Sequence, residues 1–244
     1  SVTVPGESGN TIAAWYGEGE PGAGAVLLLH GIRSDRRGTL GRALFLRDAG
    51  HTVLSIDLQA HGETLGEYIT FGYRESRDVR AALDYLRLRA PGEKIGIIGV
   101  SLGGAAVALA SPPVQADAVV LESVYSDIER AIENRLRLRF GYPGTWLEPL
   151  LSWQIEPRLG VSSDALSPID SIARMETPLF IISGKEDRHT LMAETVQLFE
   201  RAPEPKTLWL IAGAAHQNLH RYAGAEYERR ILAFFARHLR DPDA

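Results

Sequence analysis

Cysteine is absent from this chain of 244 residues. Without thiols, disulfide cross-links, thiolate nucleophiles and cysteine-ligated zinc or iron–sulfur centres are excluded. The sequence also lacks a signal-peptide pattern and any apolar run approaching the ~20 residues of a membrane-spanning helix. A cytoplasmic location is therefore favoured. The chain begins at Ser1 without an initiator methionine, so a leader or anchor ahead of that residue stays compatible with the sequence.

A strong charge of either sign is lacking as well. The formal net charge is −5, 23 % of the residues are charged, and no lysine-rich block occurs. Nucleic acids and anionic membranes attract proteins with dense basic patches, so the sequence favours neither partner. A hydrophobic content of 45 % over this length instead fits one globular α/β domain that spans residues 1–244.

Short apolar segments alternate with stretches of helical periodicity along the chain. Most of these segments are continuous apolar runs, which is typical of strands covered on both faces. Strands are predicted at residues 11–16, 25–29, 52–56, 95–98, 116–121, 178–183 and 207–211, with a further extended segment at 3–5. The alternation predicts an α/β fold with a mostly parallel, doubly wound sheet and helices on both of its faces.

Four helices are predicted from apolar stripes and from helix-ending residues. Residues 39–49 are followed by Gly50, and residues 76–89 are followed by a Pro-Gly pair. The stripes that indicate the buried faces of the last three helices are Val79, Leu83 and Leu86, then Met192, Val196 and Phe199, then Leu232, Phe235 and Leu239.

Residues 126–167 interrupt the alternation of strands and helices, because the segment is too long for a simple crossover between two strands. It is rich in large apolar side chains, namely Phe140, Tyr142, Trp146, Leu147, Leu150, Leu151 and Trp153. A segment of this composition is expected to cover other apolar groups. We therefore interpret it as a small lid over the functional site and not as a second domain.

The same insertion carries five arginines: Arg130, Arg135, Arg137, Arg139 and Arg158. They would either recognise an anionic substrate group or form the solvated side of a helix. The second interpretation is favoured, since the buried stripe of that helix is expected to be Ile128, Ile132 and Leu136.

The most informative segment is 94–110, KIGIIGVSLGGAAVALA. It predicts a strand, a very tight turn with Ser101 at its point, and a helix. Side chains at Gly99 and Gly103 would crowd such a turn, in which strained backbone projects the serine hydroxyl from the sheet edge. The amide of Leu102 would open the helix and point toward a developing oxyanion.

Two other interpretations of this turn stay open at this point. A glycine-rich strand-to-helix turn also binds dinucleotide phosphates, with an acidic residue ~20 positions later. Glu122 lies at such a distance, but Ser101 occupies the second glycine position and would block close approach of a pyrophosphate. A purely structural turn is the third possibility.

A serine nucleophile requires a general base, and in parallel sheets reactive groups collect beyond the carboxyl ends of the strands. His216 and His220 both follow the strand at 207–211, and His216 is favoured because it lies nearer to the strand end. The remaining candidates fit this criterion less well: His51, His189 and His238.

The base in turn requires an orienting carboxylate. Asp187 follows the strand at 178–183 and precedes His216, which gives the chain order Ser, Asp, His. Asp127 and Glu186 are alternative acids. The alternative interpretation of Asp187 is a turn or N-cap residue of a helix that begins near Thr190.

The second half of an oxyanion hole is expected in the loop after an early strand. Gly31 would let the backbone turn so that the amide of Ile32 faces Ser101. The ring of His30 is expected to fix this loop and not to transfer protons. Asp57 and His61 are likewise interpreted as parts of a loop that hydrogen-bonds to itself.

The chain resembles the α/β-hydrolase superfamily over essentially its full length. The matching motifs are LLLHG at 27–31, AHGETLG at 60–66, GVSLGG at 99–104, SGKED at 183–187 and GAAH at 213–216. Segments 57–86 and 167–187 are most similar to the small Bem46-like and prolyl-oligopeptidase-like serine hydrolases. The resemblance implies an α/β-hydrolase fold with Ser101 as nucleophile, Asp187 as acid, His216 as base, and the amides of Ile32 and Leu102 in the oxyanion hole.

The chain departs from the family pattern at three positions. In the G-H-G-x-S-x-G loop, Ala60 and Thr64 replace the first glycine and the serine, and His189 is an uncommon neighbour for the acid. The expected function is hydrolysis of a small-molecule carboxylic ester through an acyl-enzyme, without metal or organic cofactor. Amide or thioester cleavage on the same residues, and a ligand-binding homologue without turnover, are the alternatives; the sequence specifies neither the acyl group nor the oligomeric state.

Overall fold

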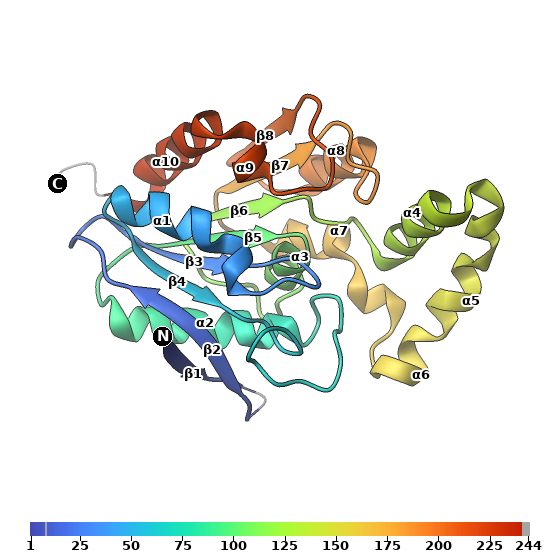
Figure 1. The fold of residues 1–244 in the computed structure, drawn as a ribbon, viewed down its shortest axis with the longest axis horizontal. Helices are drawn as coiled ribbons and strands as arrows, with labels where there is room; N and C mark the ends of the chain where they lie inside the picture. Colours follow the sequence, from blue (N-terminus) through green and yellow to red (C-terminus); the bar gives the residue numbers. More distant parts are fainter. Residues whose placement is uncertain (8, 241–244) are drawn as a thin grey trace.

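A computed structural model describes residues 1–7 and 9–240 of the protein. Its centre is an eight-stranded sheet with the order β1-β2-β4-β3-β5-β6-β7-β8 (Figure 1). The strands are β1 Val2–Pro5, β2 Thr11–Gly17, β3 Ala25–Leu29, β4 Thr52–Ile56, β5 Ile95–Val100, β6 Ala118–Glu122, β7 Leu179–Gly184 and β8 Lys206–Ile211. Strands β4, β3 and β5 to β8 are parallel, while β1 and β2 are antiparallel to their neighbours. The predicted mostly parallel sheet is confirmed, and the extended segment at 3–5 belongs to β1.

The continuous apolar runs are strands that are buried on both faces. Every residue of β3, β4, β6 and β7 is buried. Two helices, α2 Glu75–Arg89 and α3 Leu102–Ala108, cover one face, and α1 Leu40–Asp48 and α10 Ala225–Leu239 cover the other (Figure 1). The double layer of helices explains why these strands do not alternate between apolar and polar residues.

The helix stripes agree with the structure except in α8 Met192–Arg201. In α2, Val79, Leu83 and Leu86 are fully buried as predicted. In α8, however, Met192 is exposed, and the buried residues are Glu194, Thr195 and Leu198. Glu194 lies on the buried face of α8, where its carboxylate accepts a hydrogen bond from the side chain of Asn134 on α4 and another from the amide of Leu191 at the start of its own helix.

The insertion between β6 and β7 forms an arm at the side of the sheet (Figure 1). It contains α4 Ile128–Phe140, α5 Glu148–Trp153 and α6 Ile155–Leu159. Its large apolar side chains are exposed, with Trp146 at 84 % and Trp153 at 72 %. The expectation that they pack over other apolar groups is therefore wrong for this conformation of the chain. Of the predicted stripe in α4, Ile128 and Leu136 are buried.

Short elements complete the chain. They are α7 Pro168–Ser171, α9 Leu219–Ala223, and the 3-10 helices η1 Arg36–Thr39, η2 Tyr142–Leu147, η3 Ser163–Leu166 and η4 Ile172–Arg174.

A buried ion pair joins helices α1 and α10 to the end of β6. Arg42 and Glu122 are almost completely buried, and the guanidinium Nη2 lies 2.5 Å from Glu122 Oε2. The hydroxyl of Tyr227 donates to the same carboxylate and accepts from Arg42. Burial acts to lower the pKa of Arg42, but Glu122 and Tyr227 outweigh it and raise that pKa above its usual value. Because the carboxylate of Glu122 is fully used here, it is not available to a nucleotide ribose.

Glu122→Gln is expected to lower the free energy of unfolding by roughly 3–5 kcal/mol, because Arg42 keeps a buried charge without a counter-ion. Denaturant melts of the single variant, and of a variant with Arg42→Met, Glu122→Leu and Tyr227→Phe together, test this. The triple variant removes every member of the polar set and is expected to recover most of the loss. A single variant as stable as the natural chain would contradict the prediction.

The loop after β4 contains Ala60 in a left-handed backbone conformation, with φ of +57°. This is the position at which the family pattern has glycine. Thr64, at the family's serine position, is buried and accepts a hydrogen bond of 2.9 Å from the amide of Ala13. The threonine thus ties the loop to β2, while the alanine carries backbone strain.

Ala60→Gly is expected to raise the free energy of unfolding by about 0.5–1 kcal/mol, since glycine adopts positive φ without a Cβ penalty. The matched control is Ala43→Gly within α1, where the same chemical change is expected to destabilise by about 1 kcal/mol. Chemical denaturation of both variants measures the sign of the change in the free energy of unfolding for each. Equal losses would mean that Ala60 is not strained.

Candidate active site

Ser101 occupies a strained turn between β5 and α3. Its backbone has φ of +48° and ψ of −106°, and its side chain is mostly buried. A Cβ on Gly99 would lie 2.7 Å from the Cα of Gly104, and one on Gly103 would lie 2.9 Å from the carbonyl oxygen of His30. Only glycine fits at these two positions, which is the crowding that the sequence predicts for a nucleophile elbow.

Asp187 and His216 meet at the same edge of the sheet. Nδ1 of His216 lies 2.8 Å from Oδ2 of Asp187. The loops that carry them follow the neighbouring strands β7 and β8, and the amide of Glu186 donates to the carbonyl of Ala214, which joins the two loops. The structure therefore brings these two sequence-predicted residues into direct contact.

Asp187 is held rigidly by its other partners. Oδ1 accepts hydrogen bonds from the amides of His189 and Thr190, and Oδ2 also accepts one from the hydroxyl of Thr190. Burial acts to raise the pKa of Asp187, but the hydrogen bond and charge of His216, together with the two amides, outweigh it and lower the pKa below its usual value. Asp187 is thus both the turn residue and the partner of His216, and α8 begins later than expected, at Met192.

Ser101 is not joined to His216 by a hydrogen bond in the part of the chain that the structure describes. Its amide donates to the carbonyl of Glu122 at 2.7 Å, which fixes the elbow to β6, the strand that lies between β5 and β7. In unliganded enzymes the bond from nucleophile to base is often long and tightens only with substrate. The geometry therefore supplies a hydrogen-bonded Asp187–His216 pair at the sheet edge where the turn of Ser101 also lies.

Two amides beside Ser101 have no acceptor among the described residues: those of Ile32 and Leu102. Leu102 is the first residue of α3. The loop of Ile32 is docked on α3 by a 3.1 Å hydrogen bond from the amide of Gly103 to the carbonyl of His30. A Cβ on Gly31 would lie 3.4 Å from that of Ser101, so this loop runs directly beside the serine.

His30 and His61 fix loops, as the sequence predicts. In His30, Nδ1 lies 2.8 Å from the carbonyl oxygen of Gly31, and Nε2 accepts a hydrogen bond from the amide of Leu58. In His61, Nδ1 contacts the carbonyl oxygen of Gln59, and Nε2 accepts a hydrogen bond from the amide of Arg33. Both nitrogens of each ring are occupied, so neither ring is free to transfer a proton.

Asp57 belongs to the same self-bonded loop. Its Oδ1 accepts a hydrogen bond of 2.7 Å from the amide of Arg36, and its Oδ2 accepts one of 2.9 Å from the amide of Glu63. Oδ2 also forms an ion pair with the guanidinium of Arg36. The structural interpretation made from the sequence is confirmed.

The alternative acids and base lie elsewhere. His220 pairs with Glu228, and its ring packs near Phe45. Asp127 caps the start of α4 through the amide of Arg130. Glu186 is exposed, and no hydrogen bond of its side chain is recorded in the described part of the structure.

His189 is a neighbour of the acid–base pair that sequence reasoning left without a role. The centre of its ring lies 5.0 Å from that of His216. Burial, and then the charges of His216 and Arg135, lower the pKa of His189. The ring is therefore held in its neutral form at the side of the site.

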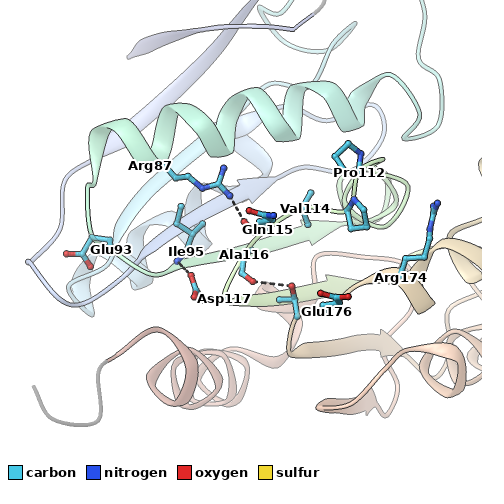
Figure 2. A pocket seen from close by; sticks show the side chains of 12 residues that line it. Arg87, Glu93, Ile95, Pro112, Val114, Gln115, Ala116, Asp117, Arg174 and Glu176 are labelled. Carbon is cyan, nitrogen blue, oxygen red and sulfur yellow. Dashed lines mark hydrogen bonds between the residues drawn. The ribbon is translucent and has the colours of Figure 1, made fainter.

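A cavity lies at the other edge of the sheet. Figure 2 shows this cavity, of about 660 Å³, at the amino ends of β5 and β6, the sheet edge opposite Ser101. Two of its polar groups are paired within the protein: Arg87 donates to the carbonyl of Gln115, and Asp117 accepts a hydrogen bond from the amide of Ile95. Among residues 1–7 and 9–240, no cluster of three or more His, Asp or Glu side chains could hold a metal ion, and no helix has the length and apolar character needed to cross a membrane.

The pH dependence of stability tests the role of His30. Burial lowers the pKa of His30 to about 4, against an ordinary value near 6.5. Between these values the unfolded chain binds a proton that the folded chain does not, so the stabilisation by the neutral ring is complete above pH 6.5 and is lost as the pH falls toward 4. When the pH is lowered from 7.5 to 4.5, the free energy of unfolding is expected to fall by roughly 2–3 kcal/mol more in the natural chain than in His30→Gln. Denaturant melts at both pH values measure the difference, and identical losses would contradict the assignment.

Comparisons with known proteins identify the family and the fold. The model of the alpha/beta hydrolase family matches residues 26–230. Two relatives are named uncharacterized proteins: YqkD of Bacillus subtilis is 24 % identical over 91 % of this chain and 76 % of its own length, and Rv2307c of Mycobacterium tuberculosis is 28 % identical over 89 % and 72 %. The solved structure of the Pyrococcus furiosus esterase Pf2001 has a TM-score of 0.77 at 23 % identity, over 97 % of this chain and 91 % of the esterase.

The family match covers residues 26–230, which include Ser101, Asp187 and His216, and the structural likeness covers 97 % of the chain. The resemblance inferred from the motifs is thereby confirmed. The chain belongs to the α/β hydrolase family.

Proposed function

We propose that this protein is a serine hydrolase that cleaves a carboxylic ester of a small molecule. The observation that carries the proposal is the hydrogen bond between buried Asp187 and His216 at the same sheet edge as the strained elbow of Ser101. Strain and buried charge of this kind are energetically costly, and they persist where function requires them.

The reaction begins with proton transfer from Ser101. The carboxylate of Asp187 accepts a hydrogen bond from Nδ1–H of His216, which leaves Nε2 as the base. Nε2 takes the hydroxyl proton as the serine oxygen bonds to the substrate carbonyl carbon. The same proton then passes to the departing alcohol, and the acyl group remains on Ser101.

Water completes the cycle. His216 removes a proton from a water molecule, the resulting oxygen attacks the acyl carbon, and Ser101 leaves with its proton restored. Asp187 holds the imidazole in one tautomer and stabilises the imidazolium that forms in both halves of the reaction. Its several hydrogen bonds keep this carboxylate ionised and immobile.

The amides of Ile32 and Leu102 are proposed to hold the oxyanion of each tetrahedral intermediate. Both lack an acceptor within the described chain, and Leu102 opens a helix whose dipole favours negative charge. One such donor typically lowers the activation barrier by roughly 3–4 kcal/mol. The chemistry proposed here uses no metal and no organic cofactor.

An ester is favoured over an amide or a thioester by the comparisons, since Pf2001 is named an esterase, as is a protein of Exiguobacterium antarcticum with a TM-score of 0.71. Helix α4 would form one wall of the substrate site, because the side chain of its Asn134 donates to the carbonyl of His189 beside the acid. The insertion is thus proposed as a lid through α4, and not through its exposed aromatic residues.

A fluorophosphonate probe tests the proposal directly. Intact-mass analysis is expected to find one adduct on the natural chain and none on Ser101→Ala, because only an activated serine attacks the phosphorus. Asp187→Asn is expected to label and to hydrolyse aryl esters roughly 10³–10⁴ times more slowly, since His216 loses its tautomer and its counter-charge. Folded protein without any adduct would favour a ligand-binding homologue instead.

A further inference from the structure

We propose that His189 is a positioning residue for His216, because its ring packs against the imidazole and holds it in the orientation that proton transfer from Ser101 requires. The inference rests on the proposed function, since it concerns the base of the same site. It is carried by the contact between the two rings, whose centres lie 5.0 Å apart, and by the hydrogen bonds that fix the backbone of His189.

The loop that carries His216 provides little support of its own. No backbone hydrogen bond is recorded for residues 215–217 in the described part of the chain, and 24 % of the His216 side chain is exposed. The ring has one recorded hydrogen bond, from Nδ1 to Asp187. A single bond fixes one ring atom but lets the imidazole rotate about the line of that bond. A second contact is required to fix the direction of Nε2, which must come within hydrogen-bond reach of the serine.

The ring of His189 supplies that second contact. The planes of the two rings are inclined at 57°. Tilted aromatic rings attract each other when their centres are about 4.5–7 Å apart, and this pair lies within that range. No hydrogen bond of the His189 ring is recorded in the described chain, so packing on His216 is the contact that the structure shows for it.

The backbone of His189 is fixed from two sides. Its amide donates to Oδ1 of Asp187 at 2.8 Å, and its carbonyl accepts a hydrogen bond of 3.3 Å from the side chain of Asn134. Asn134 is buried on α4 and also donates to the carboxylate of Glu194 on α8. The acid and the insertion therefore jointly determine where the ring of His189 lies.

The charge state of His189 suits this role. The charged groups that act on its ring are His216 on the loop after β8, Arg135 on α4 and Asp187 on its own loop. Burial, and then the charges of His216 and Arg135, outweigh Asp187 and lower the pKa of His189. A neutral ring adds no repulsion when His216 takes up a proton, whereas a cation at this position would oppose that step.

Two substitutions separate the packing of the ring from its chemistry. His189→Ala removes the ring, and His189→Phe keeps an aromatic ring without nitrogen atoms. The control is His238→Ala, which removes an imidazole that packs on Phe234 at 4.9 Å, beside the amino ends of β7 and β8. The constants kcat and KM are measured for aryl esters, and kcat is expressed per site that reacts with the fluorophosphonate probe, so that unfolded protein is not counted.

His189→Ala is expected to lower kcat about tenfold and to leave KM within about twofold, because a misaligned base slows the chemical step and not substrate binding. His189→Phe is expected to recover most of that loss, and His238→Ala to change neither constant. An unchanged kcat in His189→Ala would overturn the proposal. A loss that phenylalanine does not recover would overturn it as well, since the nitrogen atoms would then be required, and a change in KM alone would assign His189 to substrate binding instead.

Proton NMR tests the positioning role without turnover. The proton that Nδ1 of His216 donates to Asp187 is expected to resonate far downfield of the backbone amides, and its loss in Asp187→Asn identifies it. In His189→Ala this resonance is expected to broaden, because a mobile ring exposes the proton to exchange with water, and in His189→Phe to sharpen again. A resonance that stays sharp in His189→Ala, or that is absent from the natural chain, would reject the positioning role.

The two proposals fail in different ways. Failure of the fluorophosphonate probe to label the natural chain would reject the hydrolase, whereas the NMR resonance reports on the contact between His189 and His216 whether or not an ester is cleaved.

Discussion

The tight turn from β5 into α3 is the constraint on which the rest of the site depends. Without side chains at Gly99 and Gly103, the helix approaches the end of its own strand and the loop after β3, and the amide of Gly103 bonds to the carbonyl of His30. The same approach forces Ser101 to a positive φ and leaves the first helical amide unpaired. The strain at the serine and the free amide beside it thus have one physical cause.

A buried charge connects this turn to the opposite side of the site. The amide of Ser101 donates to the carbonyl of Glu122, whose carboxylate pairs with Arg42. Arg42 also donates to the side chain of Asn218, the N-cap of α9, two residues after His216. The positions of Ser101 and His216, the proposed nucleophile and base, are therefore coupled through one ion pair, whose loss would cost stability and alignment together.

The local part of this arrangement could be predicted from the sequence. Continuous apolar runs identified the buried strands, and because parallel strands end at one edge, chain position alone favoured Asp187 and His216. The rest depends on contacts between distant segments. The buried face of α8 carries Glu194, which is bonded to Asn134 of α4 and to Leu191 at the start of its own helix. The exposure of Trp146 depends on the direction in which the arm extends from the sheet, and amino-acid composition does not encode that direction.

The hydrogen bonds at this sheet edge decide what kind of ligand it can accept. The carboxylates of Asp57 and Asp187 and the rings of His30 and His61 already have protein partners. The amides of Ile32 and Leu102 lack acceptors within the described chain. Two free amide donors beside Ser101 stabilise negative charge, such as the oxyanion that is proposed to develop during attack on an ester.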